Sequence, residues 1–404
     1  MKTLEHLCIK CKGRGWCGKR CKILEQLKRF QPKIKTSFSG SSPPEIFVGH
    51  YGYPYVFAGI LAPNEYGNTQ YLSMPELWHA QKASIQDILS YRSSMIHSRF
   101  SVNVKKAKQN NKFLKILQQL SLSSKAVDAF FHLKKKPAVR IQLDSQVPLI
   151  GNPAPLKEVV LESNPKVEKK VDYLASDTDV KARIAIEELY KAKIPVSHII
   201  KMLSAGMLGT KVQRKLVPTR WAVTATDTIL SENLLEKIRD YPEISEYLLF
   251  SANYLGNYYN IILMPGPWSF EVIEISAKGY FGFGNVALWH DYEFFYGRKK
   301  YAFSVMGAYY ANRLAVCEYL EKIKKQASCL VLREIRDEYW APCGVGILRE
   351  VTREAMQKSP EKFNSIEEAL QAAQLKFQLP ISLFTMRSKL LANMKKQKKI
   401  TQFI

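Results

Sequence analysis

The sequence predicts a mixed α/β (α+β) fold: a two-part body with a small four-cysteine module before it and a basic tail after it. The 404 residues are 46% hydrophobic and 11% aromatic, which suffices for a large core and excludes a mostly disordered chain. Strand-like runs alternate with helical patterns through the body, without an internal repeat of solenoid period. Each end differs from the body in composition, because the amino-terminal end is rich in cysteine and the carboxy-terminal end is rich in lysine.

Changes in composition along the chain predict five segments. A polar stretch punctuated by prolines separates the cysteine-rich start from the first apolar run, and this marks a linker. A second body begins near Leu208, after two helical patterns. The predicted segments are a module at 1–30, a linker at 31–45, a first domain at 46–207, a second domain at 208–390 and a tail at 391–404.

The first domain begins with glycines and aromatics at Ile46–Gly59, which indicate a bent pair of strands. Ser73, Pro75 and Glu76 are typical of a helix start, and we expect that helix to run into the nineties. The remaining expectations are a basic helical region at 101–136, a strand at 139–143, a proline-rich loop at 148–165, and helices at 178–193 and 196–208.

The second domain is predicted to be rich in strands. Gly256-Asn257 should connect two of them in a hairpin, and a helix should span Ala308 to about Lys325. Ser365 and Glu368 have the spacing of a capping box that opens a helix before the tail. The expected strands are Trp221–Thr226, Tyr247–Tyr254, Tyr259–Met264, Phe270–Ile275 and Leu330–Ile335.

Four cysteines fall within fourteen residues near the start of the chain. Cys8, Cys11, Cys17 and Cys21 follow the pattern C-x2-C-x5-C-x3-C, and four thiolates this close can surround one tetrahedral ion. Zinc is the first choice for a short segment without its own core, and an iron–sulfur cluster is the rival. The more distant cysteines, Cys317, Cys329 and Cys343, are interpreted as ordinary buried thiols.

The net charge of +24 and the pI of about 9.6 predict a polyanionic partner, of which nucleic acid is the commonest. A lysine-rich solvated surface is the alternative, but the charge is uneven. The segment before Glu45 contains eleven Lys or Arg residues and only two acidic ones, Glu5 and Glu25. Six of these basic residues surround the cysteines, as expected of a finger that contacts nucleic acid: Lys10, Lys12, Arg14, Lys19, Arg20 and Lys22.

Neither a membrane span nor a signal peptide is expected. No stretch approaches the roughly 18 apolar residues that a span needs, and no apolar signal core precedes Cys8. We therefore expect an intracellular, cytoplasmic protein associated with the nucleoid, in which thiols stay reduced.

The tail carries an apolar motif after a run of lysines. Gln397, Ile400, Phe403 and Ile404 have the spacing that puts apolar side chains on one face of a single helical turn. After Glu368 there is no acidic residue, and five lysines lead into the motif. The arrangement resembles the peptide, often called a PIP box, by which replication and repair proteins bind the sliding DNA clamp PCNA. Folding of this segment back onto its own domain is the alternative.

Two clusters in the body have the polarity of a site. Arg214, Arg220 and Thr226 offer charge-assisted and hydroxyl contacts that suit phosphate oxygens, although an exposed basic loop feeding a strand is an equal interpretation. His290 and its neighbours in Trp289–Glu293 can bind a divalent metal or move a proton. On a strand, however, His290 and Tyr292 face one way and Asp291 and Glu293 the other, and a structural role for His290 is the alternative.

The cysteine set, the run Gly49–Pro54, the Trp289-His290 region and the tail together resemble the archaeal Nre family over nearly the full length. That family is known as DNA repair proteins that bind PCNA through a carboxy-terminal peptide. The resemblance implies two conjoined family domains and the same function. One departure is the final pair Phe403-Ile404, where two aromatic residues are more usual, and this implies weaker clamp binding.

The leading hypothesis is a DNA repair factor that binds damaged or distorted DNA through phosphates and is tethered to PCNA. A first rival is a metal-dependent enzyme acting on DNA or a nucleotide, using Mg²⁺ or Mn²⁺ with Asp227, Asp291, Glu293 and Arg220 in one pocket. A second rival is an RNA-binding protein whose tail packs on its own domain.

Overall fold

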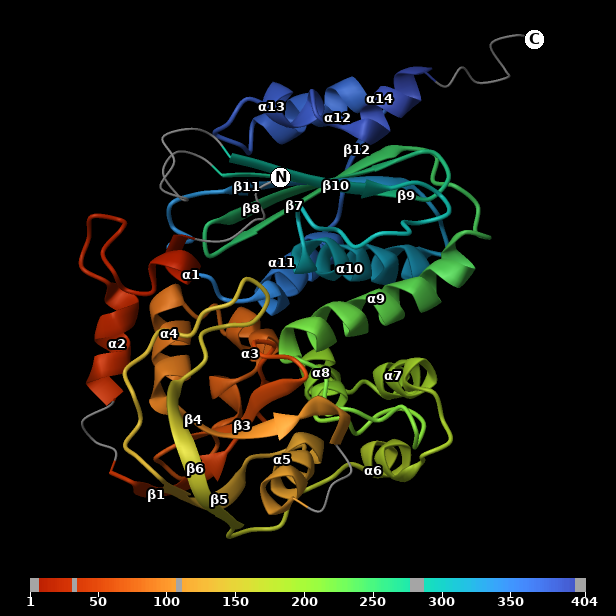
Figure 1. The fold of residues 1–404 in the computed structure, drawn as a ribbon. Helices are drawn as coiled ribbons and strands as arrows, with labels where there is room; N and C mark the ends of the chain where they lie inside the picture. The colour runs from red at the N-terminus through yellow and green to blue at the C-terminus, as the bar shows by residue number, and fades with distance from the viewer. Residues whose placement is uncertain (1–6, 31–34, 107–110, 277–286, 397–404) are drawn as a thin grey trace. The chain divides into compact units, whose positions relative to one another are not determined.

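The computed structural model describes residues 7–30, 35–106, 111–276 and 287–396 (Figure 1). The chain forms two compact units. The N-terminal unit comprises Cys8–Leu230 with Ala341–Ile347, and the C-terminal unit comprises Ser231–Trp340 with the described residues from Leu348 on. Each unit contains a six-stranded sheet of mixed strand direction, surrounded by helices. The predicted mixed α/β body in two parts is therefore confirmed.

The sheet of the N-terminal unit has the strand order β1-β5-β6-β4-β3-β2. Neighbouring strands are antiparallel except for β4 and β6, which are parallel. One face carries the apolar side chains of the core. The strands are β1 (Ser37–Ser42), β2 (Ile46–Val48), β3 (Tyr55–Pro63), β4 (Met95–Asn103), β5 (Val127–Leu133) and β6 (Asn152–Leu161).

Helix α5 places Leu114, Leu117 and Leu120 in this core, at the spacing of one helical face. Helix α9 begins in the N-terminal unit and ends in the C-terminal unit. The helices are α1 (Leu7–Cys11), α2 (Lys22–Phe30), α3 (Pro75–Ala80), α4 (Ile85–Ser94), α5 (Lys112–Leu122), α6 (Lys169–Ser176), α7 (Ala182–Lys191), α8 (Val196–Ser204) and α9 (Thr219–Ile238).

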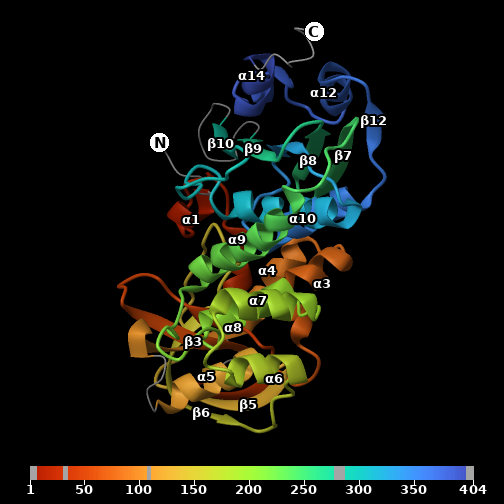
Figure 2. The same cartoon turned by 90° about the vertical axis from the view of Figure 1, so that its right-hand side faces the viewer.

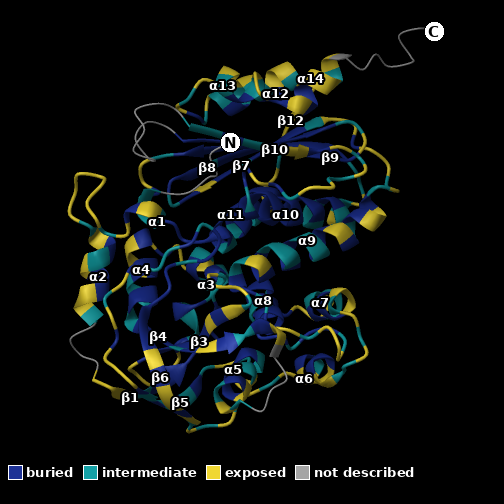
Figure 3. Ribbon diagram, viewed as in Figure 1, coloured by how far each residue is buried: buried dark blue, intermediate teal, exposed yellow. Residues whose placement is uncertain are grey.

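The sheet of the C-terminal unit has the order β10-β9-β11-β8-β7-β12, with β9 and β11 parallel and the other pairs antiparallel. Figure 3 shows its central strands as almost wholly buried, and every residue of β9 and β11 is buried. The strands are β7 (Tyr247–Tyr254), β8 (Asn257–Met264), β9 (Ser269–Ser276), β10 (Ala287–Glu293), β11 (Ser328–Ile335) and β12 (Glu361–Phe363).

Helices cover both faces of this second sheet (Figure 1 and Figure 2). On β9, Ile273 and Ile275 pack with α12–α14, while the Phe270 ring meets the Tyr309 ring of α10 edge-on on the opposite face. This alternation follows from the two-residue period of a strand. The helices are α10 (Gly307–Ile323), α11 (Val345–Gln357), α12 (Ile366–Gln374), α13 (Ser382–Thr385) and α14 (Lys389–Lys396).

Most predictions for the second domain are confirmed. Four of the five expected strands are present within about two residues, and the expected long helix is α10. The β7–β8 hairpin turns one residue earlier than predicted, at Leu255 and Gly256, which both have positive φ. Ser365 caps α12 by accepting the N–H of Glu368, but the Glu368 carboxylate reaches the N–H of Asn364 instead of that of Ser365.

The fifth expected strand, Trp221–Thr226, is wrong. These residues lie near the start of α9, and the N–H groups of Trp221 and Ala222 donate to the carbonyl of Pro218. Threonine, valine and tryptophan favour strands only weakly, and the tertiary context decides their conformation. Burial of Ala222, Val223 and Thr226 on one side of the helix supplies that context.

Four predictions for the first domain are also wrong. The helix expected from Ser73 into the nineties is two helices, because Lys82 has positive φ and Ser84 with Asp87 forms a new capping box. Among the described residues of the region 101–136, α5 is the one α-helix, and it lies between β4 and β5. The expected loop at 148–165 contains β6, and the expected strand at 139–143 has only an isolated bridge at Gln142.

None of the helices in the described part of the chain has both the length and the apolar character that crossing a membrane requires.

Candidate functional site

The cysteine module folds as two short helices joined by a glycine-rich loop. Helix α1 ends at Cys11, and Gly13 and Gly15 follow with φ of +83° and +78°. This left-handed backbone favours glycine, and it turns main-chain N–H groups toward the sulfur. The N–H of Trp16 donates to Cys11 Sγ over 3.4 Å. The loop therefore offers main-chain donors that favour the thiolate form of Cys11.

The thiols of the module influence each other electrostatically. Burial, and then the neighbouring thiols of Cys21, Cys17 and Cys11, raises the pKa of Cys8 to about 12. Burial alone would raise the pKa of Cys11, but main-chain N–H groups of the loop hold it below its ordinary value. The described residues contain no group of three or more His, Cys, Asp or Glu side chains assembled to hold a metal ion. The donor chemistry at Cys11 thus fits a soft metal, while a closed four-sulfur cluster is not preassembled.

The surface around the cysteines is basic. Lys12, Arg14 and Lys19 are exposed, and the Arg14 guanidinium lies 5.9 Å from the centre of the Trp16 ring, which is itself exposed. Such cations beside an exposed aromatic ring are suited to phosphates and bases.

The predicted phosphate contact at Arg214 has a structural role within the N-terminal unit. Its guanidinium donates to the main-chain oxygens of Gly209, Ala175 and Asp177 at 2.8, 2.6 and 2.6 Å. These bonds tie the segment after α8 to the end of α6. All three bonds use carbonyl acceptors, so the guanidinium already has protein partners.

Arg220, Thr226 and Asp227 lie on α9 instead of around the end of a strand. The Arg220 guanidinium lies 3.2 Å from an Asp144 carboxylate oxygen and 3.3 Å from His50 Nε2. Thr226 and Asp227 are fully buried. Of the three, only Arg220 lies where a surface ligand could approach it.

Asp291 and Glu293 occupy one face of β10, as the predicted alternation requires, and arginines neutralise both. Asp291 accepts from Arg298 and from the N–H groups of Ser304 and Val305 at 2.7–2.9 Å. Glu293 accepts from Arg313 at 2.9 Å and from the indole N–H of Trp268 at 3.2 Å. Asp291 and Glu293 belong to the C-terminal unit, whereas Asp227 and Arg220 belong to the N-terminal unit.

His290 points to the opposite face of β10, where it meets the buried carboxylate of Glu271 on β9. Glu271 also accepts the N–H of Lys389 at 2.6 Å, the N–H of Leu390 at 3.2 Å and the hydroxyl of Ser388. The same hydroxyl accepts the N–H of Leu391 at 3.1 Å. Glu271 and Ser388 therefore cap and anchor the N-terminus of α14.

The predicted clamp-binding residues Gln397, Ile400, Phe403 and Ile404 lie outside the described residues, directly after α14. The structure does describe α14, the helix directly before them, which we call the root of the tail. A second buried carboxylate, Glu334 on β11, strengthens the attachment of the C-terminal segment by accepting the N–H groups of Gln378 and Leu379 at 2.9 and 3.1 Å.

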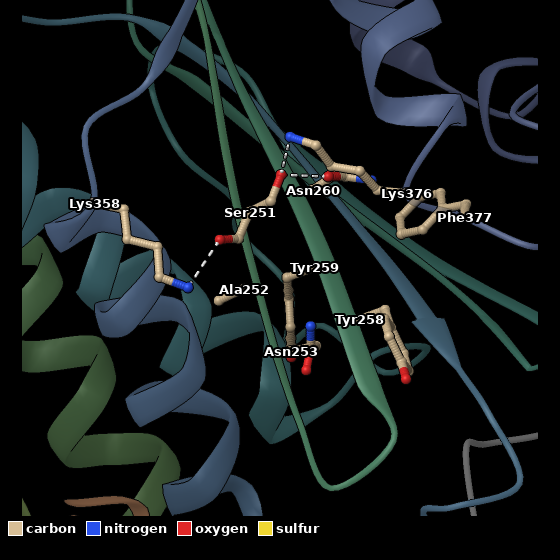
Figure 4. Close-up of a pocket in the computed structure, with 9 residues that line it drawn as sticks. All are labelled: Ser251, Ala252, Asn253, Tyr258, Tyr259, Asn260, Lys358, Lys376 and Phe377. Atoms are coloured by element: carbon tan, nitrogen blue, oxygen red, sulfur yellow. Dashed lines mark hydrogen bonds between the residues drawn. The ribbon is translucent and has the colours of Figure 1, made fainter.

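One pocket of the C-terminal unit, of about 290 Å³, lies beside β7 and β8. Figure 4 shows Lys358 and Lys376 reaching Ser251 from two sides. The Lys376 ammonium donates to the Ser251 hydroxyl at 3.0 Å and the Lys358 ammonium to its carbonyl at 3.4 Å. Because both cations are engaged by the strand, we assign this pocket no ligand.

A pocket of about 260 Å³ in the N-terminal unit contains a buried ionic cluster. Glu45 lies 2.7 Å from the Lys201 ammonium and 3.0 Å from the Arg92 guanidinium. Burial lowers the pKa of Lys201, and Glu45 opposes that shift. Glu45, which directly precedes β2, thus links α4 and α8, with one carboxylate between two cations.

The family description "Archaeal Nre, N-terminal" matches residues 16–281, and "Archaeal Nre, C-terminal" matches residues 293–403. The chain belongs to the archaeal Nre family. The family resemblance inferred from the sequence is thereby confirmed. No solved structure matches the chain.

The relatives with curated names are DNA repair proteins. DNA repair protein NreB of Archaeoglobus fulgidus is 38% identical over 366 residues, covering 90% of this chain and 91% of the relative. NreA of the same organism is 35% identical over 369 residues, covering 91% and 92%. NreA of Haloferax volcanii is 31% identical over 387 residues, covering 91% and 90%.

Sequence reasoning missed Glu271, Glu334 and Lys201. The first two had a visible signal, because each is a carboxylate within a largely apolar strand run, although Glu274 and Arg333 lie in the same runs. A buried carboxylate needs several hydrogen-bond donors, and such a run therefore predicts that another segment of the chain supplies them. Lys201 had no comparable signal, because it fits the pattern of an ordinary amphipathic helix.

Proposed function

We propose that this chain is a DNA repair factor that binds DNA and is tethered to the PCNA clamp through Gln397–Ile404. The observation that carries the proposal is the anchored root of the tail. Glu271 fixes the start of α14, and the motif begins at the residue after the helix ends. The apolar spacing of this tail sequence, after a basic helix, suits a hydrophobic pocket on a ring that surrounds DNA.

DNA binding in this proposal is led by phosphates. A net charge of +24 and the exposed cations around the cysteine loop support it, as does membership in a family with named DNA repair proteins. Tethering adds a high local concentration near DNA without any new contact. A modest DNA affinity is therefore sufficient.

Zinc is the metal we propose for Cys8, Cys11, Cys17 and Cys21. The C-x2-C-x5-C-x3-C spacing and the N–H bond from Trp16 to Cys11 Sγ support thiolate ligation there. The metal would hold the loop that carries Lys12 and Arg14 in one conformation, since a segment this short has little core. Metal analysis of the intact chain should find one zinc per chain, and Cys17→Ser should remove it while Cys329→Ser should not. Iron with acid-labile sulfide would contradict zinc.

The tether is tested by pull-down on immobilised PCNA. The intact chain and Thr401→Ala should be retained, because Thr401 lies outside the apolar positions of the motif. Removal of residues 397–404, or Phe403→Ala, should abolish retention while thermal unfolding and zinc content stay unchanged. Equal retention of the truncated chain would disprove the tether.

The phosphate-led mode is tested by measuring DNA affinity against salt. The logarithm of the binding constant should fall steeply and linearly with the logarithm of salt concentration. A flat response would contradict contacts to the DNA backbone. Defined flapped, nicked and abasic duplexes in the same assay would show which DNA structure is preferred.

A further inference from the structure

Five large aromatic side chains are exposed together on the N-terminal unit, between 44% and 79% each. We call them the aromatic patch: Tyr51, Tyr53, Tyr55, Phe57 and Trp221. Because burial of large aromatic side chains is favourable, a cluster of them left in water indicates a ligand that covers it.

The patch occupies the face of the sheet that lies opposite the core. Along β3, Val56 and Ala58 point into the core while Tyr55 and Phe57 are exposed. The strand register pairs Phe57 with Ser101 and Gly59 with Arg99 on β4, so Arg99 shares the outer face. A strand and its neighbour thus present two rings and a cation to solvent.

The rest of the patch is held in place by contacts among its own rings. The Tyr53 and Trp221 ring centres are 5.4 Å apart, which links the loop before β3 to the first turn of α9. Tyr51 packs on His50 at 4.0 Å, and His50 in turn lies beside Arg220. The rings are therefore pre-positioned, and binding would order few side chains.

Two arginines beside the patch have uncompensated charge. The Arg99 guanidinium lies 4.3 Å from the centre of the Phe57 ring. Burial, and then the positive charge of Arg140, lowers the pKa of Arg99, so Arg140 repels Arg99 electrostatically. Neither forms an ion pair with any residue that the structure describes. An anion between them would relieve their repulsion.

We propose that the aromatic patch binds single-stranded DNA, with unpaired bases stacked on Tyr55 and Phe57 and the backbone phosphates beside Arg99 and Arg140. Proteins bind single strands through exposed aromatic rings next to unpaired cations. Every base can stack on a ring, and every phosphodiester group of the backbone carries a negative charge. A duplex cannot use the rings, since its bases are already stacked on each other. The proposal rests on the proposed DNA-binding function and names the form of DNA that this face takes.

Fluorescence anisotropy with a labelled oligodeoxythymidine and the full chain tests the proposal. Tyr55→Ala and Phe57→Ala should each weaken binding roughly tenfold. Phe57→Trp keeps an aromatic ring at this position and should bind as tightly as the parent chain. Tyr173→Ala is the matched control, because Tyr173 is equally exposed on α6 and lies outside the patch. Arg140→Gln should weaken binding and reduce the salt dependence, since it removes one phosphate contact.

The outcomes separate this inference from the proposed function. If the intact chain binds no DNA, the proposed function fails. If it binds DNA and the Tyr55 and Phe57 variants bind single strands equally well, only this inference fails. If the Tyr55 and Phe57 variants lose more affinity for an RNA oligomer than for the DNA oligomer, the patch is assigned to RNA instead. Photo-crosslinking to iododeoxyuridine gives a check without substitutions: crosslinks are expected at Tyr55 or Phe57, and crosslinks confined to other segments would overturn the proposal.

Discussion

Replacing Glu271 by alanine should detach the base of the tail. Its carboxylate is fully buried and accepts four donors: the N–H groups of Lys389 and Leu390, the Ser388 hydroxyl and His290. A hydrogen bond to a charged group contributes about 1.5–3 kcal/mol. Four such bonds do not add, because water reaches a freed helix end. We therefore expect Glu271→Ala to cost about 3–5 kcal/mol, which is more than one such bond contributes and less than the sum of four.

Urea unfolding and limited trypsin digestion measure this effect. The free energy of unfolding should fall by that amount, and cleavage after Lys389 should accelerate. Glu246→Ala is the matched control, because Glu246 forms an exposed ion pair with Lys362 at 2.8 Å, and exposed pairs contribute little to stability. The anchoring role would be refuted if Glu271→Ala stayed within about 1 kcal/mol of the parent chain and its tryptic cleavage were unchanged.

Three further changes have defined outcomes. Glu334→Ala should cost roughly 2–4 kcal/mol in the same urea assay, because it leaves the N–H groups of Gln378 and Leu379 without their acceptor; an unchanged midpoint would contradict this. Gly151→Ala should destabilise the N-terminal unit by about 1–3 kcal/mol or more, since a Cβ there would overlap the carbonyl oxygen of Met95, and calorimetry should show a lower Tm. Burial, with Arg99 and Arg92, lowers the pKa of His97 from 6.5 to about 3. Below pH 6.5 the unfolded chain binds a proton that the folded chain does not. The free energy of unfolding should therefore fall, as the pH is lowered from 6.5 to 3, by up to about 1.4 kcal/mol per pH unit. His97→Asn should make this slope shallower, and an identical slope would disprove the assignment.

The sequence predicted the C-terminal unit better than the N-terminal unit. The β7–β8 hairpin and α10 follow from local signals, namely a glycine at a two-residue turn and a long run with helical periodicity. The Trp221–Thr226 run failed because its strand-favouring residues are buried on one side of a helix. β6 was missed because Pro153 and Pro155 were interpreted as loop residues, although each lies within the strand.

The candidate site was predictable only where the chemistry is contiguous in sequence. The cysteine spacing and the tail motif are both local patterns. The aromatic patch joins Tyr53 to Trp221, residues that only the fold brings near one another. Similarly, the link between Glu271 and Lys389 crosses more than a hundred residues, and no local pattern encodes it.

The central claim is that a clamp tether concentrates this protein on DNA. Its most direct test is the apparent affinity of the intact chain for a nicked circular DNA, measured with and without loaded PCNA. The loaded clamp should raise that affinity by about 10²–10⁴, and the chain without residues 397–404 should gain nothing. Equal gains for both chains, or no gain for the intact one, would contradict the account.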